Sequence, residues 1–204
     1  MQKSVAVLFA AAISATVFAA DLVKLPEPQR EGGTGFFTVL NQRRSVRRYA
    51  EENLSQQELS NLLWAGFGVS GKKDKRTAPT AVNRREFTLY AILADGAYKY
   101  IPQENGLEKL TSEDLRPLAA GNVTAPAYIL IVADMKKAAN AEYAAIDSGY
   151  ISQNLYLAAT AQGLGSCALG SFKRKVENVA KLKAALKLAD HENPILSQAV
   201  GKLK

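Results

Sequence analysis

Four arginines and one serine stand within residues 43–49, whose sequence is RRSVRRY. A guanidinium is a planar fork of donors that matches a phosphate, and a serine hydroxyl adds a short, directional donor. This arginine run can therefore hold a phosphate monoester through several charge-assisted hydrogen bonds at once. A solvated basic patch is the simpler interpretation of the same residues, so the rest of the chain must decide between the two.

The elements around the arginine run follow from local signals. A short apolar stretch at 36–41 predicts a helix, which places the arginines in the turn that leaves it. Ser55 and Glu58 then form the Ser-x-x-Glu pattern of a capping box, followed by apolar residues at helical spacing. Gly66, Gly68 and Gly71 predict the end of that second helix.

Strands and further helices are mixed along the rest of the chain. Strands are predicted at 86–93 and 98–101, and Asp95-Gly96 between them is the strongest short hairpin signal. An apolar run at 127–133 predicts a strand buried on both faces. A helix at 141–162 is apolar nearly all round, which predicts burial in the core. The other predicted elements are helices at 111–121 and 172–188 and strands at 166–169 and 195–200. Together they indicate an α+β fold.

The length of 204 residues is consistent with one domain preceded by an export signal. Residues 1–19 have the layout of a secretory signal peptide, with one lysine, an apolar core and a small residue before the cut. The apolar core is short for a membrane span, so we expect no stable membrane insertion and a periplasmic or secreted protein, with an uncleaved anchor as the alternative. Residues 20–35 are expected to form an N-terminal arm and 36–204 the domain.

Charge and cysteine content limit the partners and the chemistry. The formal net charge of +7 favours anionic ligands without identifying one, and it does not by itself indicate nucleic acid, which we do not expect as a partner. A single cysteine, Cys167, excludes an intramolecular disulfide framework. We interpret Cys167 as a core residue, His191 as a surface residue, and Trp64, Tyr150 and Tyr156 as packing residues.

Four segments, taken in order, resemble the nitroreductase family. Residues 43–47 resemble its N-terminal flavin motif, and 79–83 (PTAVN) resemble its second motif. Residues 147–167 resemble the central helix with its exit turn, and 199–201 the closing strand. The version here is similar to the compact, peptide-oxidase-like branch. The resemblance implies a mixed sheet flanked by helices, with one buried central helix and an FMN-binding domain at 36–204.

The resemblance also implies an activity. Members of the family are FMN-dependent oxidoreductases that form homodimers, with FMN bound at the subunit interface. In their ping-pong reaction the flavin takes a hydride, usually from NADH or NADPH, and passes electrons to a small-molecule substrate, here of the nitro, quinone or enone type. The isoalloxazine ring carries the chemistry while the protein supplies position and electrostatics.

Individual residues match the family pattern at the phosphate end and along the ring. Arg43 and Ser45 match the phosphate and ribityl contacts, with Arg44 assisting. Arg47 matches a basic position near the pyrimidine end of the ring, where a fixed positive charge stabilises the reduced, anionic flavin. Asn83 matches a residue whose amide pairs with the polar edge of the ring, since one amide both donates and accepts.

The segment Leu169, Gly170 and Ser171 matches the one whose backbone N–H faces flavin N5, which makes Gly170 the expected catalytic position. Gly170 stands where nitro-reducing members commonly have an acidic residue, so side-chain help at N5 is absent. The chain stops at Lys204, and Lys202 and Lys204 are the candidates to replace the phosphate ligands of a longer C-terminal arm. Export puts the usual NADH or NADPH donor in question.

Two other classes of protein also explain phosphate contacts. One is a flavin- or anion-binding protein without turnover, such as an electron carrier in the periplasm. The other is a basic module that binds acidic polymers or lipid headgroups. Asn83 together with 169–171 distinguishes a flavin site from a polyanion-binding surface, because a protein that binds polyanions does not need an amide that hydrogen-bonds to the edge of a ring.

Overall fold

A computed structural model of the protein describes residues 22–204, and the expected signal peptide at 1–19 lies outside them. The strands are β1 (Leu22–Lys24), β2 (Phe87–Leu93), β3 (Gly96–Ile101), β4 (Gly106–Thr111), β5 (Ala127–Asp134), β6 (Leu164–Leu169) and β7 (Glu192–Lys202). The α-helices are α1 (Phe36–Gln42), α2 (Gln56–Phe67), α3 (Arg116–Ala119), α4 (Ala141–Ala161) and α5 (Val176–Ala185). Short 3-10 turns lie at Lys72–Asp74, Ala81–Asn83 and Gly170–Arg174.

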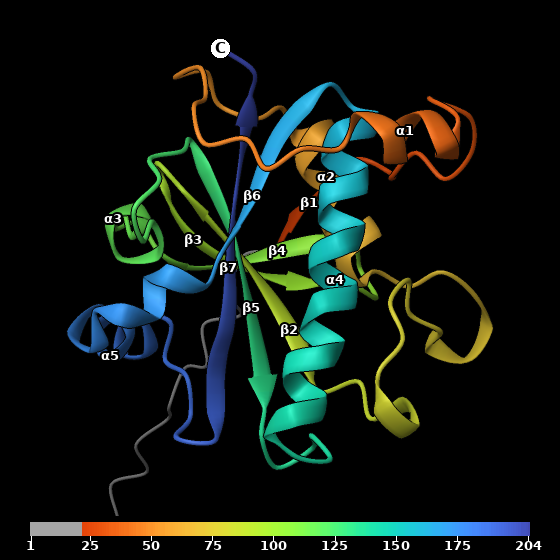
Figure 1. The fold of residues 1–204 in the computed structure, drawn as a ribbon. Coiled ribbons are helices and arrows are strands. Elements are labelled where there is room, and N and C mark those ends of the chain that lie inside the picture. The colour runs from red at the N-terminus through yellow and green to blue at the C-terminus, as the bar shows by residue number, and fades with distance from the viewer. Residues whose placement is uncertain (1–21) are drawn as a thin grey trace, which may run out of the picture.

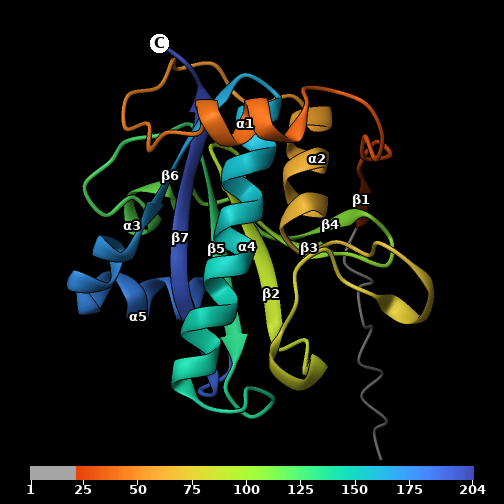
Figure 2. The ribbon, with the colours of Figure 1, turned by 45° about the vertical axis from the view of Figure 1, so that its right-hand side comes forward.

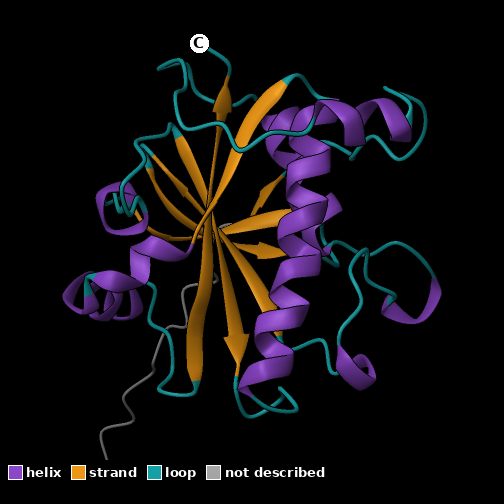
Figure 3. Ribbon diagram, in the orientation of Figure 1, coloured by secondary structure: helices purple, strands orange, loops and turns teal. Residues whose placement is uncertain are grey.

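One seven-stranded sheet forms the centre of the molecule, in the order β1-β4-β3-β2-β5-β7-β6. Each pair of neighbouring strands is antiparallel, and a parallel contact occurs at the isolated bridge between Ser45 and Ser166. Helices α1, α2 and α4 lie on one side of the sheet and α3 and α5 on the other (Figures 1 and 3). The expected α+β fold is confirmed, but the expected mixed sheet is wrong, because all the strand pairs of the described residues are antiparallel.

The sheet separates two apolar cores, one under α2 and α4 and the other under α3 and α5. Strand β5 contributes to both, because seven of its eight residues are buried. A strand that is covered on both faces reads as a continuous apolar run, which is why the sequence predicted it. The hairpin between β2 and β3 also forms, but its turn is at Ala94-Asp95, one residue before the expected position, and Gly96 already pairs with Leu93.

Helix α2 begins at the predicted capping box. The Ser55 hydroxyl accepts from the Glu58 N–H at 3.2 Å, and the Glu58 carboxylate accepts from the Ser55 N–H at 2.6 Å. The helix ends at Phe67 with Gly68 as its C-cap, which confirms the end predicted from these glycines, and Gly66 lies inside its last turn. A Cβ at Gly66 would lie 3.0 Å from a Leu155 methyl group, so this glycine lets α2 pack closely on α4.

Two predictions in the first half of the chain need correction. The helix expected at 111–121 is reduced to α3, and β4 lies before it, paired with β3. Part of the arm expected at 20–35 is a strand, since β1 pairs with β4 at the edge of the sheet. Strand β4 contains Glu108 and Lys109, which have little strand propensity, so pairing with its neighbours decides its conformation.

The basic helix expected at 172–188 is also shorter than predicted. A 3-10 turn occupies Gly170–Arg174, and α5 begins only at Val176. Val176 is 77% exposed, whereas Leu182 and Leu186 are buried. Because Val176 opens the helix, it lies before the turns that pack on the sheet.

Helix α4 lies along the sheet with α1 over its C-terminal end (Figure 2). Asn140 caps its N-terminus by accepting from the Tyr143 N–H at 2.9 Å, and Gly163 follows its end with φ +72°, the conformation that glycine permits. The helix is central, but in the single chain only its sheet-facing side is buried. Tyr143, Ile146 and Tyr150 are 45–47% exposed on the other side. None of the helices in residues 22–204 has both the length and the apolar character to cross a membrane.

Candidate functional site

The arginine run leaves α1 as predicted, and one of its arginines closes that helix. The Arg43 N–H donates to the Val39 carbonyl at 2.9 Å. The Arg44 guanidinium turns back to the carbonyls of Asn41 and Arg43, at 2.7 and 2.9 Å. Cations at a helix C-terminus satisfy its free carbonyls and its dipole. Arg44 is therefore engaged in capping α1.

The arginine run then passes alongside β6, the strand at one edge of the sheet. The Val46 N–H donates to the Ser166 carbonyl at 2.9 Å, next to the parallel bridge between Ser45 and Ser166. Under this contact lies a buried polar chain, in which Ser152 on α4 donates to Gln198 at 2.6 Å and Gln198 donates to Ser166 at 2.7 Å. These bonds fix α4, β7, β6 and the arginine run relative to one another.

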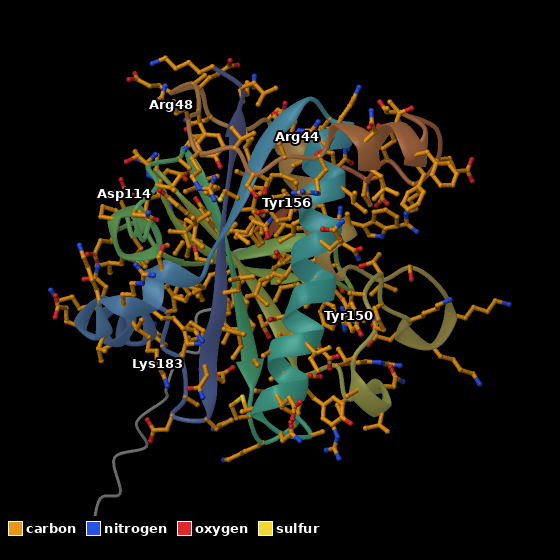
Figure 4. All side chains as sticks on the ribbon, viewed as in Figure 1. Arg44, Arg48, Asp114, Tyr150, Tyr156 and Lys183 are labelled. Carbon is orange, nitrogen blue, oxygen red and sulfur yellow. The ribbon has the colours of Figure 1, made fainter. Side chains whose placement is uncertain are left out.

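Tyr156 on α4 is the point at which the predicted residues meet. Its hydroxyl lies 3.1 Å from the Ser45 hydroxyl and accepts from the Ala168 N–H at 2.8 Å. The Arg43 guanidinium lies 5.0 Å from the centre of its ring, within the range of a cation–π interaction. Figure 4 shows Tyr156 near the end of α4, beside β6 and below the segment that carries Arg44.

Our interpretation of Tyr156 as a packing residue was therefore incomplete. Ser45 lies 111 positions away from Tyr156 in the sequence, and no local pattern predicts a contact between residues so far apart in the chain. The structure brings together Arg43, Ser45 and the strand that leads to Gly170.

The end of β6 leaves open space at Gly170. Leu169 is buried, whereas Gly170 is exposed and a Cβ placed there would have no atom within 4 Å. Ser171 is engaged elsewhere, because its hydroxyl donates to the Asn122 side chain at 2.9 Å. The backbone at Gly170 is thus accessible to a planar group, while the Ser171 side chain is already bonded within the fold.

Asn83 lies apart from this site. Its loop is held to α4 by the Ala81 N–H, which donates to Asp147 at 2.7 Å. Asp147 precedes Tyr156 by nine residues, which at 100° and 1.5 Å per residue puts them on opposite flanks of α4 and about 14 Å apart along its axis. In Figure 1 the olive segment that contains Asn83 lies on one side of α4 and β6 on the other. Asn83 is exposed with φ +55°, and within one chain it does not join Arg43 and Gly170.

The C-terminal lysines lie beside the segment that follows the arginine run. The Ala50 N–H donates to the Lys202 carbonyl at 3.0 Å. The Lys202 ammonium pairs with Glu52, and this hydrogen bond raises the pKa of Lys202. Lys204 is exposed. Lys202 is therefore committed to a carboxylate, and a phosphate contact from either lysine stays a prediction.

A cavity beside α2 and α4 is a separate feature. It has a volume of about 630 Å³ and lies between residues 29–36, α2 and α4, with Trp64 and Leu157 in its wall. Polar side chains at its rim bond to one another, as Asn61 does to Gln162 at 2.8 Å. Among the described residues that line it, none is a predicted flavin contact, so the cavity is distinct from the site at Tyr156.

A buried pair of carboxyl groups supports the loop that carries Asn83. Glu86 and Asp147 are both 3% exposed, and neither Glu86 oxygen reaches a hydrogen-bond partner among the described residues. Burial raises the pKa of Glu86 from its ordinary value of 4.5, and the neighbouring Asp147 raises it further, against the charge of Arg84. A buried carboxyl beside a second carboxyl is disfavoured in its charged form, so Glu86 takes up a proton more readily when the protein is folded.

This pair predicts a pH-dependent stability. The folded state binds the Glu86 proton up to a higher pH than the unfolded state, so the free energy of unfolding falls as pH rises above about 4.5. Glu86→Gln removes the titrating group and is expected to flatten that fall. Urea unfolding between pH 5 and pH 8 measures it, with Glu113→Gln as an exposed control. An unchanged slope in the Glu86→Gln variant would contradict the assignment.

Comparison with known proteins places this arrangement in a class. A solved protein of Ralstonia eutropha JMP134 assigned as a nitroreductase superposes with a TM-score of 0.82 and 29% identity, covering 92% of each chain. A Methanocaldococcus jannaschii protein assigned as a nitroreductase is 29% identical in an alignment of length 184 that covers 80% of this chain and 89% of that protein.

A nitroreductase-type structure from Desulfovibrio desulfuricans, solved in complex with FMN, has a TM-score of 0.61 at 24% identity. It covers 83% of this chain and 87% of its own, and at that identity it shows a common fold.

The family itself follows from a direct match. The model of the nitroreductase family matches residues 40–202, which include the last three residues of α1, all of α4 and nearly all of the sheet. The chain belongs to the nitroreductase family, a family of oxidoreductases. The family resemblance inferred from the sequence is thereby confirmed.

Proposed function

We propose that this protein is an FMN-dependent oxidoreductase that transfers electrons to a small organic acceptor of the nitro, quinone or enone type. The observation that carries the proposal is the meeting of Arg43, Ser45 and the strand leading to Gly170 at Tyr156. These groups come from three separate segments of the chain. A site for an extended ligand with a phosphate at one end needs contacts from several segments.

The residues present fit a bound FMN at both of its ends. Arg43 and Ser45 supply a guanidinium and a hydroxyl for a phosphate, and Arg47 in the same run is exposed. At the other end, the space beside Gly170 admits a flat ring against the backbone. When bound, the isoalloxazine ring supplies hydride and electron transfer. The chain's own part is to bind the phosphate, orient the ring and present a backbone N–H at Gly170.

The proposal includes a homodimer. Tyr143, Ile146 and Tyr150 recur on the exposed side of α4, and apolar stripes of this kind are typical of helices that pack against another element. Gly149 lies in the same stripe, and a Cβ there would meet nothing within 4 Å. A glycine inside a helix costs up to about 1 kcal/mol relative to alanine, and here it leaves room for a second copy.

A dimer also explains the position of Asn83. Within one chain the Asn83 loop and the Tyr156 site contact opposite flanks of α4. A second copy packed on the exposed side of α4 can bring its own Asn83 loop to the first copy's Arg43 and Gly170. Each flavin would then be held by Arg43 and Gly170 of one chain and by Asn83 of the partner subunit.

The proposed location of the protein limits the choice of electron donor. We propose that the signal peptide expected at 1–19 directs the protein to the periplasm or out of the cell, where NADH and NADPH are scarce. NADH and NADPH are still candidate donors, and a reduced electron carrier that is itself exported is the alternative. A flavoprotein without turnover of its own would present the same phosphate contacts.

Absorption spectroscopy tests the proposal directly. FMN is added to the purified mature protein, which is then passed over a gel-filtration column. A flavin band that elutes with the protein at the dimer position supports both the cofactor and the assembly. Turnover of a quinone with NADH or NADPH separates the enzyme from a carrier. Absence of retained flavin overturns the proposal and favours a binder of acidic polymers.

A further inference from the structure

We propose that Tyr156 is a positioning residue that fixes the Ser45 hydroxyl as a donor toward the flavin phosphate. The inference rests on the proposed function and goes beyond it, because it assigns a role to a residue that is not among the expected cofactor contacts. Its basis is the chain of contacts from the Ala168 N–H through the Tyr156 hydroxyl to the Ser45 hydroxyl, at 2.8 and 3.1 Å.

The direction of this chain follows from which groups can donate. A backbone N–H can only donate, so the Tyr156 oxygen accepts from Ala168. The Tyr156 proton is then free to be donated, and the Ser45 oxygen is its acceptor. In the reverse arrangement the tyrosine proton would have no acceptor among the contacts of the described residues. With the tyrosine as donor, the Ser45 proton points away from Tyr156 and is available to an anion.

The ring of Tyr156 positions a second donor. The Arg43 guanidinium lies 5.0 Å from the ring centre, where the negative face of an aromatic ring attracts a cation. One side chain thus places two donors with two different parts, the hydroxyl holding Ser45 and the ring holding Arg43. The two effects can be separated experimentally, because Tyr156→Phe removes the hydroxyl and keeps the ring.

Tyr156 is itself held rigidly. It stands on α4, which is bonded through Ser152 and Gln198 to Ser166, the residue beside Ser45 in the parallel bridge. Ser152, Gln198 and Ser166 are all buried. A donor that is oriented before the ligand arrives loses less conformational freedom on binding, and hydrogen bonds in a chain polarise one another. We call the chain of hydrogen bonds from Ala168 through Tyr156 to Ser45 the relay. By orienting the Ser45 donor in advance, the relay raises the affinity specifically for the phosphate of the ligand.

The experiment compares FMN with riboflavin, which lacks the phosphate. We expect Tyr156→Phe to lower the affinity for FMN about tenfold, the size of one lost charge-assisted contact, and that for riboflavin by less than about twofold. Tyr98→Phe is the matched control, since it removes a tyrosine hydroxyl that bonds to Asp95 in the β2–β3 hairpin, outside both the proposed flavin site and the proposed dimer face of α4. In a Ser45→Ala background, Tyr156→Phe is expected to have no further effect on FMN, because the relay has lost its last member.

The outcomes separate this inference from the proposed function. FMN affinity unchanged in Tyr156→Phe, or FMN and riboflavin weakened equally, would overturn the relay and leave the flavin site standing. The relay would also be overturned if Tyr156→Phe lowered the affinity for FMN in the Ser45→Ala background as much as it does in the wild-type protein. A wild-type protein that binds neither flavin would overturn the proposed function and the relay together. Retained riboflavin binding shows in the same titration that the variant is folded.

Discussion

Arg43→Ala is expected to weaken FMN binding by about 2–4 kcal/mol, the cost of removing one partner of a hydrogen-bonded charge pair. In affinity this is about 30- to 1,000-fold. Arg43 is the arginine of the run whose guanidinium is held against the Tyr156 ring, beside the Ser45 hydroxyl. Arg44 cannot replace it without leaving the carbonyls at the end of α1. Titration of the apoprotein with FMN, followed by quenching of flavin fluorescence, measures the change.

Arg48→Ala is the matched control for Arg43→Ala. It removes the same charge from the same run, but Arg48 is exposed and lies away from Tyr156 (Figure 4). Loss of one charge at a distance changes affinity little at physiological salt, because exposed charges are screened within about 8 Å. Equal losses in the two variants would show a diffuse basic patch. Unchanged flavin content in Arg43→Ala would contradict its assignment to the phosphate.

The parts of the fold that could be predicted from the sequence are those with a local signal. The capping box at Ser55 and the continuous apolar strand β5 formed where their patterns lay, and the β2–β3 hairpin formed one residue before its Asp95-Gly96 signal. The arginine run also leaves α1 as expected. Each depends on neighbours a few residues away, so the physical cause is present in a short window of sequence.

The parts that sequence reasoning missed depend on distant partners. Strand β4 takes its conformation from β1 and β3 on either side. Tyr156 gains its place in the site from Ser45, far away in the sequence, and Glu86 gains its raised pKa from burial beside Asp147. Helix α4 was expected to be buried all round because its composition is apolar, but a composition does not say whether the same chain or a second one covers each side.

A second copy that covers the exposed side of α4 can be tested by complementation, in which two variants that each bind FMN poorly are combined in one dimer. Arg43→Ala and Asn83→Ala are made in separately tagged chains, and the mixed dimer is isolated through both tags. If each flavin is held by Arg43 of one chain and Asn83 of the other, one site of the mixed dimer keeps both residues and the other keeps neither. About half of its sites should then bind FMN with wild-type affinity, as the two-fold symmetry of such a dimer requires.

A site built within one chain gives a different titration. Every site of the mixed dimer would then carry one of the two substitutions, and no phase of wild-type affinity would appear. The Asp147 contact on one flank of α4 and the Tyr156 contact on the other argue for the first result. The two single-variant dimers are the controls, since each should lack the tight phase at both of its sites. Recovery in the mixed dimer can arise only if Arg43 and Asn83 reach the same flavin from different chains.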